Sequence, residues 1–452
     1  MKFLILGLML SSFAWAQKND LTHRPKSFLT SGGKAVFVDF LEANYKISYN
    51  LNNRSAQVTA TIKFDAPEAG MPVFDSDENP MSVSLNGEVV SSKEIKTPGR
   101  ETELRIIRKD VTIGTHTAVI TVPLKNLIEW RNGEVRNAFW NSDLMDRRFL
   151  ERYMPASFEY DQVKMKFEVE VVGNTKSKYK IYANGDVVSN GDNKFTINFP
   201  EYFNNSSVFY HIIPEGASDE IQFTLKSVDG RDIPVTIYTI KPEVLDADKL
   251  KTLSTQIFHE LEGDYGAWPH PSLTVYNAGR GGMEYHGATI TSTSALGHEM
   301  FHSYFARGVM PANGNAGWLD EALASWRDKG YNTTYELTGV SRMSNQFYYT
   351  RTTDASAYTF GERFMSYMDG KLKAKGGLKP FMRHMLEKRL FAPLFVEEFI
   401  KEMSDFYGES VEEDFKKFTF GTKNSFQKSL QSERHDHPMH QKMTAEELQK
   451  LL

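Results

Sequence analysis

The sequence predicts an α+β protein in which a β-rich first part is followed by a mainly helical second part. Between about residues 39 and 241, apolar and polar residues alternate in steps of two, which is typical of half-buried strands. After Pro242 the apolar spacing changes to three and four residues, which is typical of helices that cover a core. A length of 452 residues allows two or three domains, and we place the boundary at about residue 242.

Five segments of the first part show the alternation most clearly: 46–49, 56–62, 116–122, 163–171 and 234–238. Four Asn-Gly pairs supply turns suited to hairpins, because both residue types tolerate positive φ. The pairs begin at Asn86, Asn132, Asn184 and Asn190. No helical pattern of useful length interrupts this part. We therefore predict a β-sheet domain over residues 17–241.

In the second part, residues 246–265 carry the clearest helical stripe, formed by Leu250, Leu253, Ile257, Phe258 and Leu261. A short strand is expected at 273–276, and helical patterns then dominate to Phe420. We predict a second domain over residues 242–425. Residues 426–452 are expected to form a polar tail with a short helix at its end.

The N-terminus has the composition of an export signal. Lys2 precedes a short apolar run, and Ala14-Trp15-Ala16 is a small-x-small cleavage site. A membrane anchor is the alternative, but the run is shorter than the ~20 residues needed to span a bilayer. We predict that residues 1–16 are a signal peptide cleaved near Ala16 and that the chain is exported, to the periplasm or outside the cell. No later stretch predicts a membrane span in the mature chain.

The composition excludes several classes of function. Hydrophobic residues make up 40% and charged residues 25%, as in ordinary globular proteins, and the net charge of −5 gives no reason to expect a nucleic-acid partner. The chain contains no cysteine. Disulfides, thiolate ligands and a cysteine nucleophile are therefore excluded, and any zinc site must use His and carboxylates.

Residues 298–302, with the sequence His-Glu-Met-Phe-His, have the spacing of a zinc site. On a helix, His298 and His302 lie one turn apart on the same face, so both imidazoles can bind one metal. Glu299 is rotated away from them, so its carboxylate can reach a water at the metal. The pattern is short enough to arise by chance, and its context decides its meaning.

A catalytic zinc takes three protein ligands and keeps one position open. Glu321 lies nineteen positions after His302, in a predicted helix with an apolar face at residues 318–326. A solvated surface glutamate is the alternative, but the preceding motif favours Glu321 as the third ligand. Upstream, the glycines of Gly281-Gly282-Met283-Glu284-Tyr285 let a backbone approach a ligand, and an edge strand there could accept an extended peptide.

These motifs together resemble the gluzincin aminopeptidases, the family of alanyl and leucyl aminopeptidases and leukotriene hydrolase. Residues 281–285 are similar to that family's Gly-x-Met-Glu-Asn motif, and residues 298–302 with 318–324 are similar to its zinc signature. The resemblance implies a saddle-like N-terminal β domain, a thermolysin-like catalytic domain and one Zn²⁺ per chain. It also implies that Glu284, beside Gly281, Gly282 and Met283, holds the α-amino group of the substrate.

The resemblance further implies an oxyanion-stabilising tyrosine, for which Tyr358 is the best match, with Tyr348 and Tyr349 as alternatives. The sequence departs from the family pattern at Phe360, where the family has lysine, and at Tyr285, where it has asparagine. The large C-terminal helical domain of the family has no counterpart, so we expect a short version with a more open site.

The sequence therefore predicts a zinc aminopeptidase that acts on peptides with a free N-terminus, with Glu299 as general base. A zinc endopeptidase, another hydrolase on the same scaffold and a non-catalytic peptide-binding relative are the alternatives. Among the other histidines, His259 and His270 are expected in turns or at the core edge, and His286 there or in the pocket. His435, His437 and His440 are expected in a solvated tail or, alternatively, a second metal-binding segment.

Overall fold

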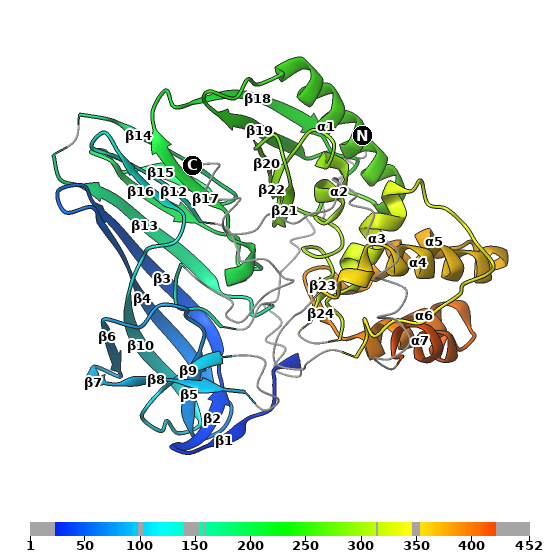
Figure 1. Ribbon diagram of the computed structural model, residues 1–452, viewed down its shortest axis with the longest axis horizontal. Helices are drawn as coiled ribbons and strands as arrows, with labels where there is room; N and C mark the ends of the chain where they lie inside the picture. Colours follow the sequence, from blue (N-terminus) through cyan, green and yellow to red (C-terminus); the bar gives the residue numbers. More distant parts are fainter. Residues whose placement is uncertain are drawn as a thin grey trace, which may run out of the picture.

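The computed structural model describes residues 23–97, 103–139, 153–157, 160–174, 176–312, 315–345 and 353–421. It has the predicted α+β organisation: Figure 1 shows strands gathered on one side and most helices on the other. The predicted signal peptide, the polar tail with its three histidines, Tyr348 and Tyr349 lie outside the described residues. No helix of the described residues is long and apolar enough to cross a membrane.

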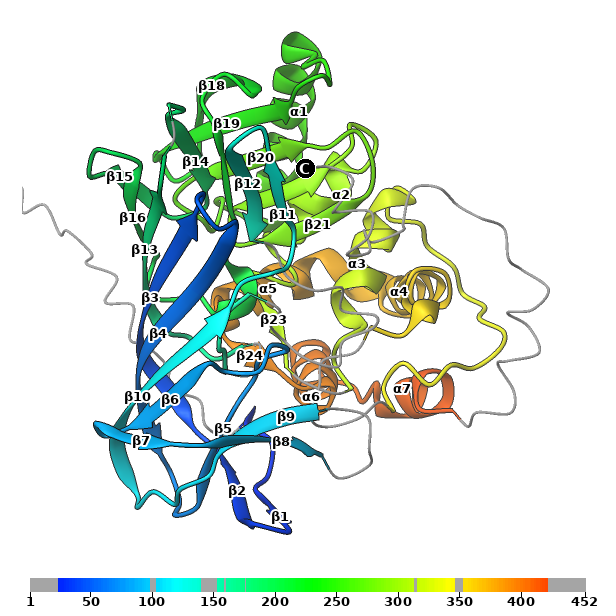
Figure 2. The same ribbon diagram turned by 60° about the vertical axis from the view of Figure 1, so that its left-hand side comes forward.

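Three sheets build the first part (Figure 2). The largest has the strand order β15-β16-β13-β3-β4-β10-β6-β7, with bounds β3 Asp39–Asn50, β4 Ser55–Ala66, β6 Ser82–Leu85, β7 Glu88–Val90, β10 Gly114–Pro123, β13 Lys164–Val172, β15 Asp186–Ser189 and β16 Lys194–Asn198. The second has the order β1-β2-β5-β9-β8, with β1 Phe28–Thr30, β2 Gly33–Phe37, β5 Met71–Phe74, β8 Ser92–Lys96 and β9 Glu103–Ile107. The third has the order β11-β12-β17-β14, with β11 Ile128–Arg131, β12 Glu134–Phe139, β14 Tyr179–Ala183 and β17 Tyr210–Pro214.

The predicted alternation is confirmed in these strands. In β4 every second side chain is buried, from Ala56 to Phe64, and β13 repeats the pattern from Met165 to Val171. Burying one face of each strand fixes the register, since a shift by one residue would turn the apolar side chains to solvent. Four of the five predicted strand segments lie within observed strands, and the fifth, 163–171, begins one residue before β13.

Three of the four Asn-Gly pairs close hairpins, and the fourth does not. Asn86-Gly87 joins β6 to β7 with φ of 52° and 82°, which is the positive-φ geometry of a two-residue hairpin turn. Asn132 and Asn190 begin the turns of the β11–β12 and β15–β16 hairpins.

Asn184-Gly185 instead carries the chain from β14 in one sheet to β15 in another, so the hairpin expected there is wrong. The buried Asn184 side chain accepts from the Phe209 amide and donates to the carbonyls of Ser207 and His286. A Cβ at Gly185 would lie 2.8 Å from the Asn198 carbonyl oxygen, so glycine is required for close approach to β16.

A fourth sheet has the order β18-β19-β20-β22-β21. Its strands are β18 Ser218–Lys226, β19 Asp232–Ile240, β20 Leu273–Asn277, β21 Gly282–Tyr285 and β22 Ala288–Thr291. Strands β21 and β22 contact the helix that carries the His-Glu-x-x-His motif. Strands β18 and β19 precede residue 242, yet β19 pairs in parallel with β20 beyond it. The sheet therefore crosses the predicted boundary, because alternation identifies a strand but not the sheet that it joins.

The helices follow the predicted order: α1 Ala247–Tyr265, α2 Leu296–Phe301, α3 Leu319–Asp328, α4 Phe360–Lys371, α5 Leu378–Arg389, α6 Val396–Tyr407 and α7 Glu412–Thr419. Three 3-10 turns, η2 Asn205–Ser207, η3 Ala355–Ala357 and η4 Lys373–Lys375, and the small pair β23 Met310–Pro311 with β24 Pro393–Leu394 complete the described elements. Helix α1 begins where the Asp246 carboxylate accepts from the Lys249 amide, which caps its first turn.

The fourth sheet has a buried core on each face. Val235, Ile237 and Val275 point into the core that the helices cover. Tyr238 and Tyr276, one residue further along the same strands, point into the core of the β-rich first part. Successive residues of a strand face opposite sides, so this one sheet is a wall shared by both cores.

The hydrogen bonds of Asn184, at the corner between β14 and β15, predict the effect of a substitution on the free energy of unfolding. Asn184→Ala removes three buried hydrogen bonds and leaves their backbone partners unsatisfied, so the free energy of unfolding should fall by about 2 kcal/mol or more. Denaturant unfolding measures the change. The control is Asn190→Ala, whose exposed side chain contacts Thr196 and should cost less than about 0.5 kcal/mol. Equal losses in the two variants would contradict this role of the corner.

Candidate metal centre

Helix α2 carries the His-Glu-x-x-His motif and lies against β21, β22, α1 and α3. It is only six residues long, and His302 forms its C-terminal cap. The amide of His302 lies 3.4 Å from the carbonyl oxygen of His298, which keeps both imidazoles on successive turns of one face. The predicted helical placement of His298 and His302 is therefore present, on a shorter helix than the motif alone suggests.

Glu321, in the first turn of α3, meets both imidazoles. Its Oε2 lies 3.1 Å from the Nε2 of His298 and 3.4 Å from the Nε2 of His302. Ligand atoms of a tetrahedral zinc are about 3.3 Å apart when the bonds are about 2.0 Å long. All three side chains are buried. The donor set and its spacing therefore fit Zn²⁺.

The outer nitrogen of each imidazole is held by a second group. The Nδ1 of His298 lies 2.6 Å from Oδ2 of Asp328, and the Nδ1 of His302 lies 3.1 Å from the carbonyl oxygen of Phe305. A partner on the outer nitrogen fixes the tautomer and aims the other nitrogen at the metal. Asp328 was not among the predicted site residues. Its signal in the sequence is its place seven residues after Glu321, two helical turns along the same face.

The charges around the imidazoles favour a cation. Burial opposes protonation of His298, yet hydrogen bonds to Asp328 and Glu321 raise its pKa well above the usual value. Burial likewise opposes protonation of His302, while the charges of Glu321 and Glu284 raise its pKa. The carboxylates therefore create a field that stabilises positive charge where the two Nε2 atoms converge, which is a property that a divalent metal site needs.

Glu299 points toward β21 rather than toward Glu321. A Cβ on Gly282 would lie 1.9 Å from its Oε1, so the carboxylate occupies the space that any side chain at position 282 would need. Burial, opposed by the charges of His298 and His302, raises the pKa of Glu299 to about 7. Within the described part of the chain its Oε2 has no hydrogen-bond partner. A carboxyl group with a pKa near neutrality is suited to accept and release a proton.

Glu284 lies on β21, which is the edge strand of the fourth sheet within the described residues. Its carboxylate is fully buried, and one of its oxygens lies within 4.8 Å of ligand atoms of Glu299 and His302. An ion pair joins its Oε1 to Nη2 of Arg307 at 3.4 Å. Glu284 thus lies beside candidate metal-binding residues, and it is already ion-paired with Arg307, which no sequence motif indicated.

The other predicted residues at this strand do not present a polar side chain. Gly281 has a φ of 61°, a conformation that favours glycine, and its carbonyl accepts from the Ser292 amide. Met283 is fully buried in the core of the first part. Glu284 therefore lies near the candidate metal ligands, and two glycines, Gly281 and Gly282, stand where the strand begins.

Tyr358, between η3 and α4, lies beside the metal residues. Burial, the charge of Glu321, a hydrogen bond to Glu321 and the charge of Glu284 raise the pKa of its phenol well above the usual value. Asp354 caps η3 through the Ser356 amide and so fixes the turn that presents the tyrosine. The phenol stays protonated at neutral pH and can donate a hydrogen bond.

Three further histidines of the predicted second part, His259, His270 and His286, belong to neither group of potential metal ligands in the described residues. His259 is exposed on α1, and His270 is buried, with Nε2 placed 3.1 Å from the Ser303 carbonyl oxygen. His286 is buried in the turn between β21 and β22 and stacks on Phe203 at 4.7 Å. Burial lowers the pKa of His286 well below its usual value, so it is a neutral packing residue.

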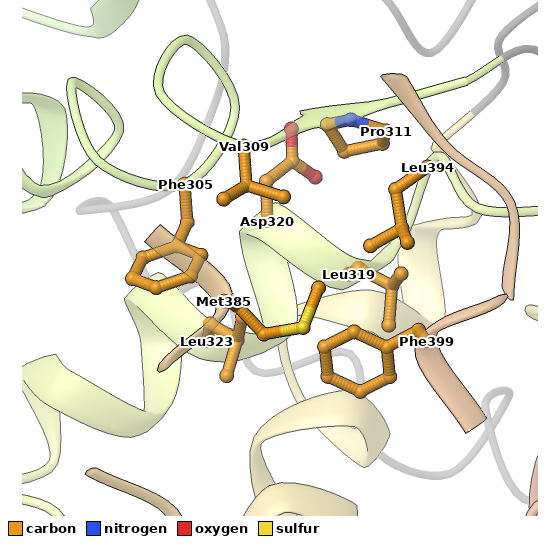
Figure 3. Close-up of a pocket in the computed structure, with 9 residues that line it drawn as sticks. All are labelled: Phe305, Val309, Pro311, Leu319, Asp320, Leu323, Met385, Leu394 and Phe399. Carbon is orange, nitrogen blue, oxygen red and sulfur yellow. The ribbon is translucent and has the colours of Figure 1, made fainter. Parts of the chain in front are cut away.

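A small cavity is lined in part by residues of the segment that follows His302. Figure 3 shows the Asp320 carboxylate at its rim near Val309 and Pro311, with the Phe305 ring at one side. The other lining residues are Leu319, Leu323, Met385, Leu394 and Phe399. The Oδ1 of Asp320 accepts a hydrogen bond from the Glu321 amide, so this carboxylate binds a backbone group in the first turn of α3. The cavity is part of the helical core and not of the metal centre.

Comparison with known proteins shows the fold. No protein-family model and no curated protein matches the sequence. Among solved structures, the chain resembles native leukotriene A4 hydrolase from Saccharomyces cerevisiae at a TM-score of 0.62 and 12% identity, covering 83% of this chain and 66% of that one. It also resembles Legionella pneumophila aminopeptidase A in complex with aspartic acid, at 0.63 and 13%, covering 87% and 51%.

A third similar structure is an M1 zinc metallopeptidase of Deinococcus radiodurans bound to a Tyr-Ser-Ala substrate. The TM-score is 0.62 at 13% identity, with 84% of this chain and 93% of that chain covered. At these identities the likeness establishes a common fold: a multi-sheet β domain followed by a helical region, as in the M1 zinc metallopeptidases and leukotriene A4 hydrolase. The chain spans less than two thirds of the yeast hydrolase and about half of the Legionella protein.

The role of Asp328, the partner of the His298 Nδ1, can be tested by measuring the affinity for zinc. Asp328→Asn keeps the shape but loses the charge that orients and polarises the imidazole, so zinc affinity should fall about 10- to 100-fold. Competition with a chromogenic chelator measures it. Asp264→Asn is the matched control, because Asp264 is 22% exposed against 19% for Asp328 and is ion-paired to Lys379 outside the centre. Unchanged affinity in Asp328→Asn would contradict the assignment.

Proposed function

We propose that this chain is an exported zinc metallo-aminopeptidase that removes the N-terminal residue from peptides. The observation that carries the proposal is the convergence of His298, His302 and Glu321 at zinc-ligand spacing beside an edge strand that presents Glu284. The fold shared with zinc metallopeptidases supports a hydrolase. The signal-like N-terminus supports export.

His298, His302 and Glu321 would hold the metal. When bound there, zinc supplies Lewis acidity for the scissile carbonyl and lowers the pKa of water from 15.7 toward 7. Glu299 takes the proton from the attacking water and then passes it to the leaving amine. Burial raises the pKa of Glu299 above the usual range of a carboxyl group, which favours its holding the proton between the two steps.

Tyr358 donates a hydrogen bond to the oxyanion that forms at the scissile carbonyl. Its raised pKa keeps the phenol protonated at neutral pH. A donor that is fixed before the reaction contributes a few kcal/mol to transition-state stabilisation, since it needs no reorganisation. The turn capped by Asp354 supplies that fixed position.

Glu284 accepts hydrogen bonds from the ammonium group of the peptide, whose backbone lies along β21, the edge strand of the fourth sheet within the described residues. An amino group held at Glu284 brings the first peptide bond to the metal residues, which limits cleavage to one residue. The substrates are therefore peptides with a free N-terminus.

A zinc endopeptidase is the second candidate, and the Arg307–Glu284 pair favours it. A carboxylate that is already paired with a guanidinium attracts an ammonium less strongly. Hydrolysis of N-acetylated peptides as fast as that of free peptides would select this candidate over the aminopeptidase.

The general base can be tested with Glu299→Gln. The amide cannot accept the proton, so kcat should fall about 10²- to 10⁴-fold while zinc content stays near one per chain. Hydrolysis of leucine and alanine anilides, together with metal analysis, measures both quantities. Near-normal kcat with bound zinc would remove Glu299 from this role. Zinc-free protein that no added zinc activates would overturn the enzyme assignment itself.

The anchor for the amino group can be tested with Glu284→Gln, which keeps the volume of the side chain. The loss of one charge-assisted contact should lower kcat/KM for free-amine substrates about 10- to 100-fold. Hydrolysis of N-acetylated peptides, which carry no ammonium, should change less than about threefold. Equal effects on the two substrate classes would contradict the exopeptidase function.

A further inference from the structure

Arg307 is a buried arginine whose contacts join three elements around the candidate centre. It is 1% exposed. Its Nη2 donates to the backbone carbonyl of Glu284 at 3.1 Å and lies 3.4 Å from the Oε1 of the same residue. Its Nη1 lies 3.4 and 3.3 Å from the hydroxyls of Ser206 and Ser207 in η2.

A buried ion pair is a poor way to gain stability. Removing two charges from water costs several kcal/mol per ion, and apolar residues of similar volume often stabilise a protein as well or better. Both side chains of the Arg307–Glu284 pair are essentially inaccessible to water. Its position beside the residues of the candidate centre therefore favours a role in the reaction over a role in stability.

The backbone at Arg307 is tied to a proposed metal ligand. The Arg307 amide donates to the His302 carbonyl at 2.9 Å, so the origin of the side chain is fixed relative to the metal motif. Ala306, just before it, has a φ of 140°, a conformation that residues other than glycine rarely adopt. Such strain persists where the surroundings determine the backbone, and it is found most often at functional sites.

The two serines that contact the Arg307 guanidinium are also held by hydrogen bonds. The hydroxyls of Ser206 and Ser207 both donate to Oδ1 of Asn204, at 2.9 and 2.6 Å. All three residues are buried. The guanidinium therefore reaches from the His302 loop to η2 in the first part, with the Glu284 segment of β21 held between them.

We propose that Arg307 is a positioning residue that holds the Glu284 carboxylate and its strand at the distance from the metal residues that amine binding needs. The inference rests on the role of Glu284 in the proposed function. Because one guanidinium nitrogen contacts both the carboxylate and the carbonyl of Glu284, it fixes the side chain relative to its own backbone. The selection of a free N-terminus then depends on Arg307 as well as on Glu284.

The experiment measures binding, so that it does not depend on turnover. In the zinc-loaded Glu299→Gln protein, calorimetry compares trialanine with N-acetyl-trialanine, and the ratio of the two dissociation constants gives the free-amine preference. Arg307→Met should reduce this preference about tenfold. Arg307→Lys keeps one positive charge and should restore part of it.

A double-mutant cycle separates positioning from general damage. In a Glu284→Gln background, Arg307→Met should change the preference less than about twofold, because the group through which it acts is gone. This double variant also removes the uncompensated buried charge, so it should be less destabilised than Arg307→Met alone. Arg105→Met is the matched control: Arg105 is 3% exposed and donates to the carbonyls of Ser76 and Asp77, far along the chain from the centre.

The outcomes distinguish the inference from the proposed function. An unchanged preference in Arg307→Met would overturn the inference, and a higher preference would also overturn it by showing that the guanidinium competes with the ammonium. Equal binding of both peptides before any change at Arg307 would overturn the inference together with the role of Glu284. An Arg307-dependent preference in a chain that hydrolyses no aminoacyl anilide would support the inference and overturn the proposed function alone.

Discussion

The close approach of α2 to the edge strand β21 is the constraint on which the candidate centre depends. The Glu299 carboxylate occupies the space that a Cβ on Gly282 would need. The helix can therefore approach the strand closely only because residue 282 is a glycine. The same helix turns its imidazoles toward Glu321 on α3. If α2 moved away from β21, Glu299 would leave the strand edge while the histidines would lose their alignment with Glu321.

Local patterns in the sequence were sufficient to predict most of the elements and to single out candidate metal ligands. A strand buries every second residue and a helix every third or fourth, so β4, β13 and α1 were predicted within a few residues. The metal residues were predicted because a motif with fixed spacing on a helix determines its own geometry. Glu321 followed from the need for a third ligand on a neighbouring helix, and the structure brings it to both imidazoles.

The sequence could not give the contacts that depend on packing between distant segments. Arg307 meets Ser206 and Ser207, about a hundred residues earlier, and only the folded chain makes them neighbours. Asn184 looked like its three Asn-Gly counterparts, but it joins two sheets through buried hydrogen bonds. The composition change at residue 242 indicated where helices begin, and it carried no information about the sheet that β18 and β19 join.

The sheet shared by the two cores has a consequence for the modularity of the molecule. A fragment that began at residue 242 would lack β19, the neighbour of β20, and would turn Tyr276 from a buried core toward water. A fragment that ended there would keep β18 and β19 without the helix α1 that covers them. A cut at residue 242 would therefore open both cores, so exchanging the β-rich part would expose apolar surface of the other part. The β-rich part supplies one wall of the scaffold that holds Glu284 in reach of the metal residues.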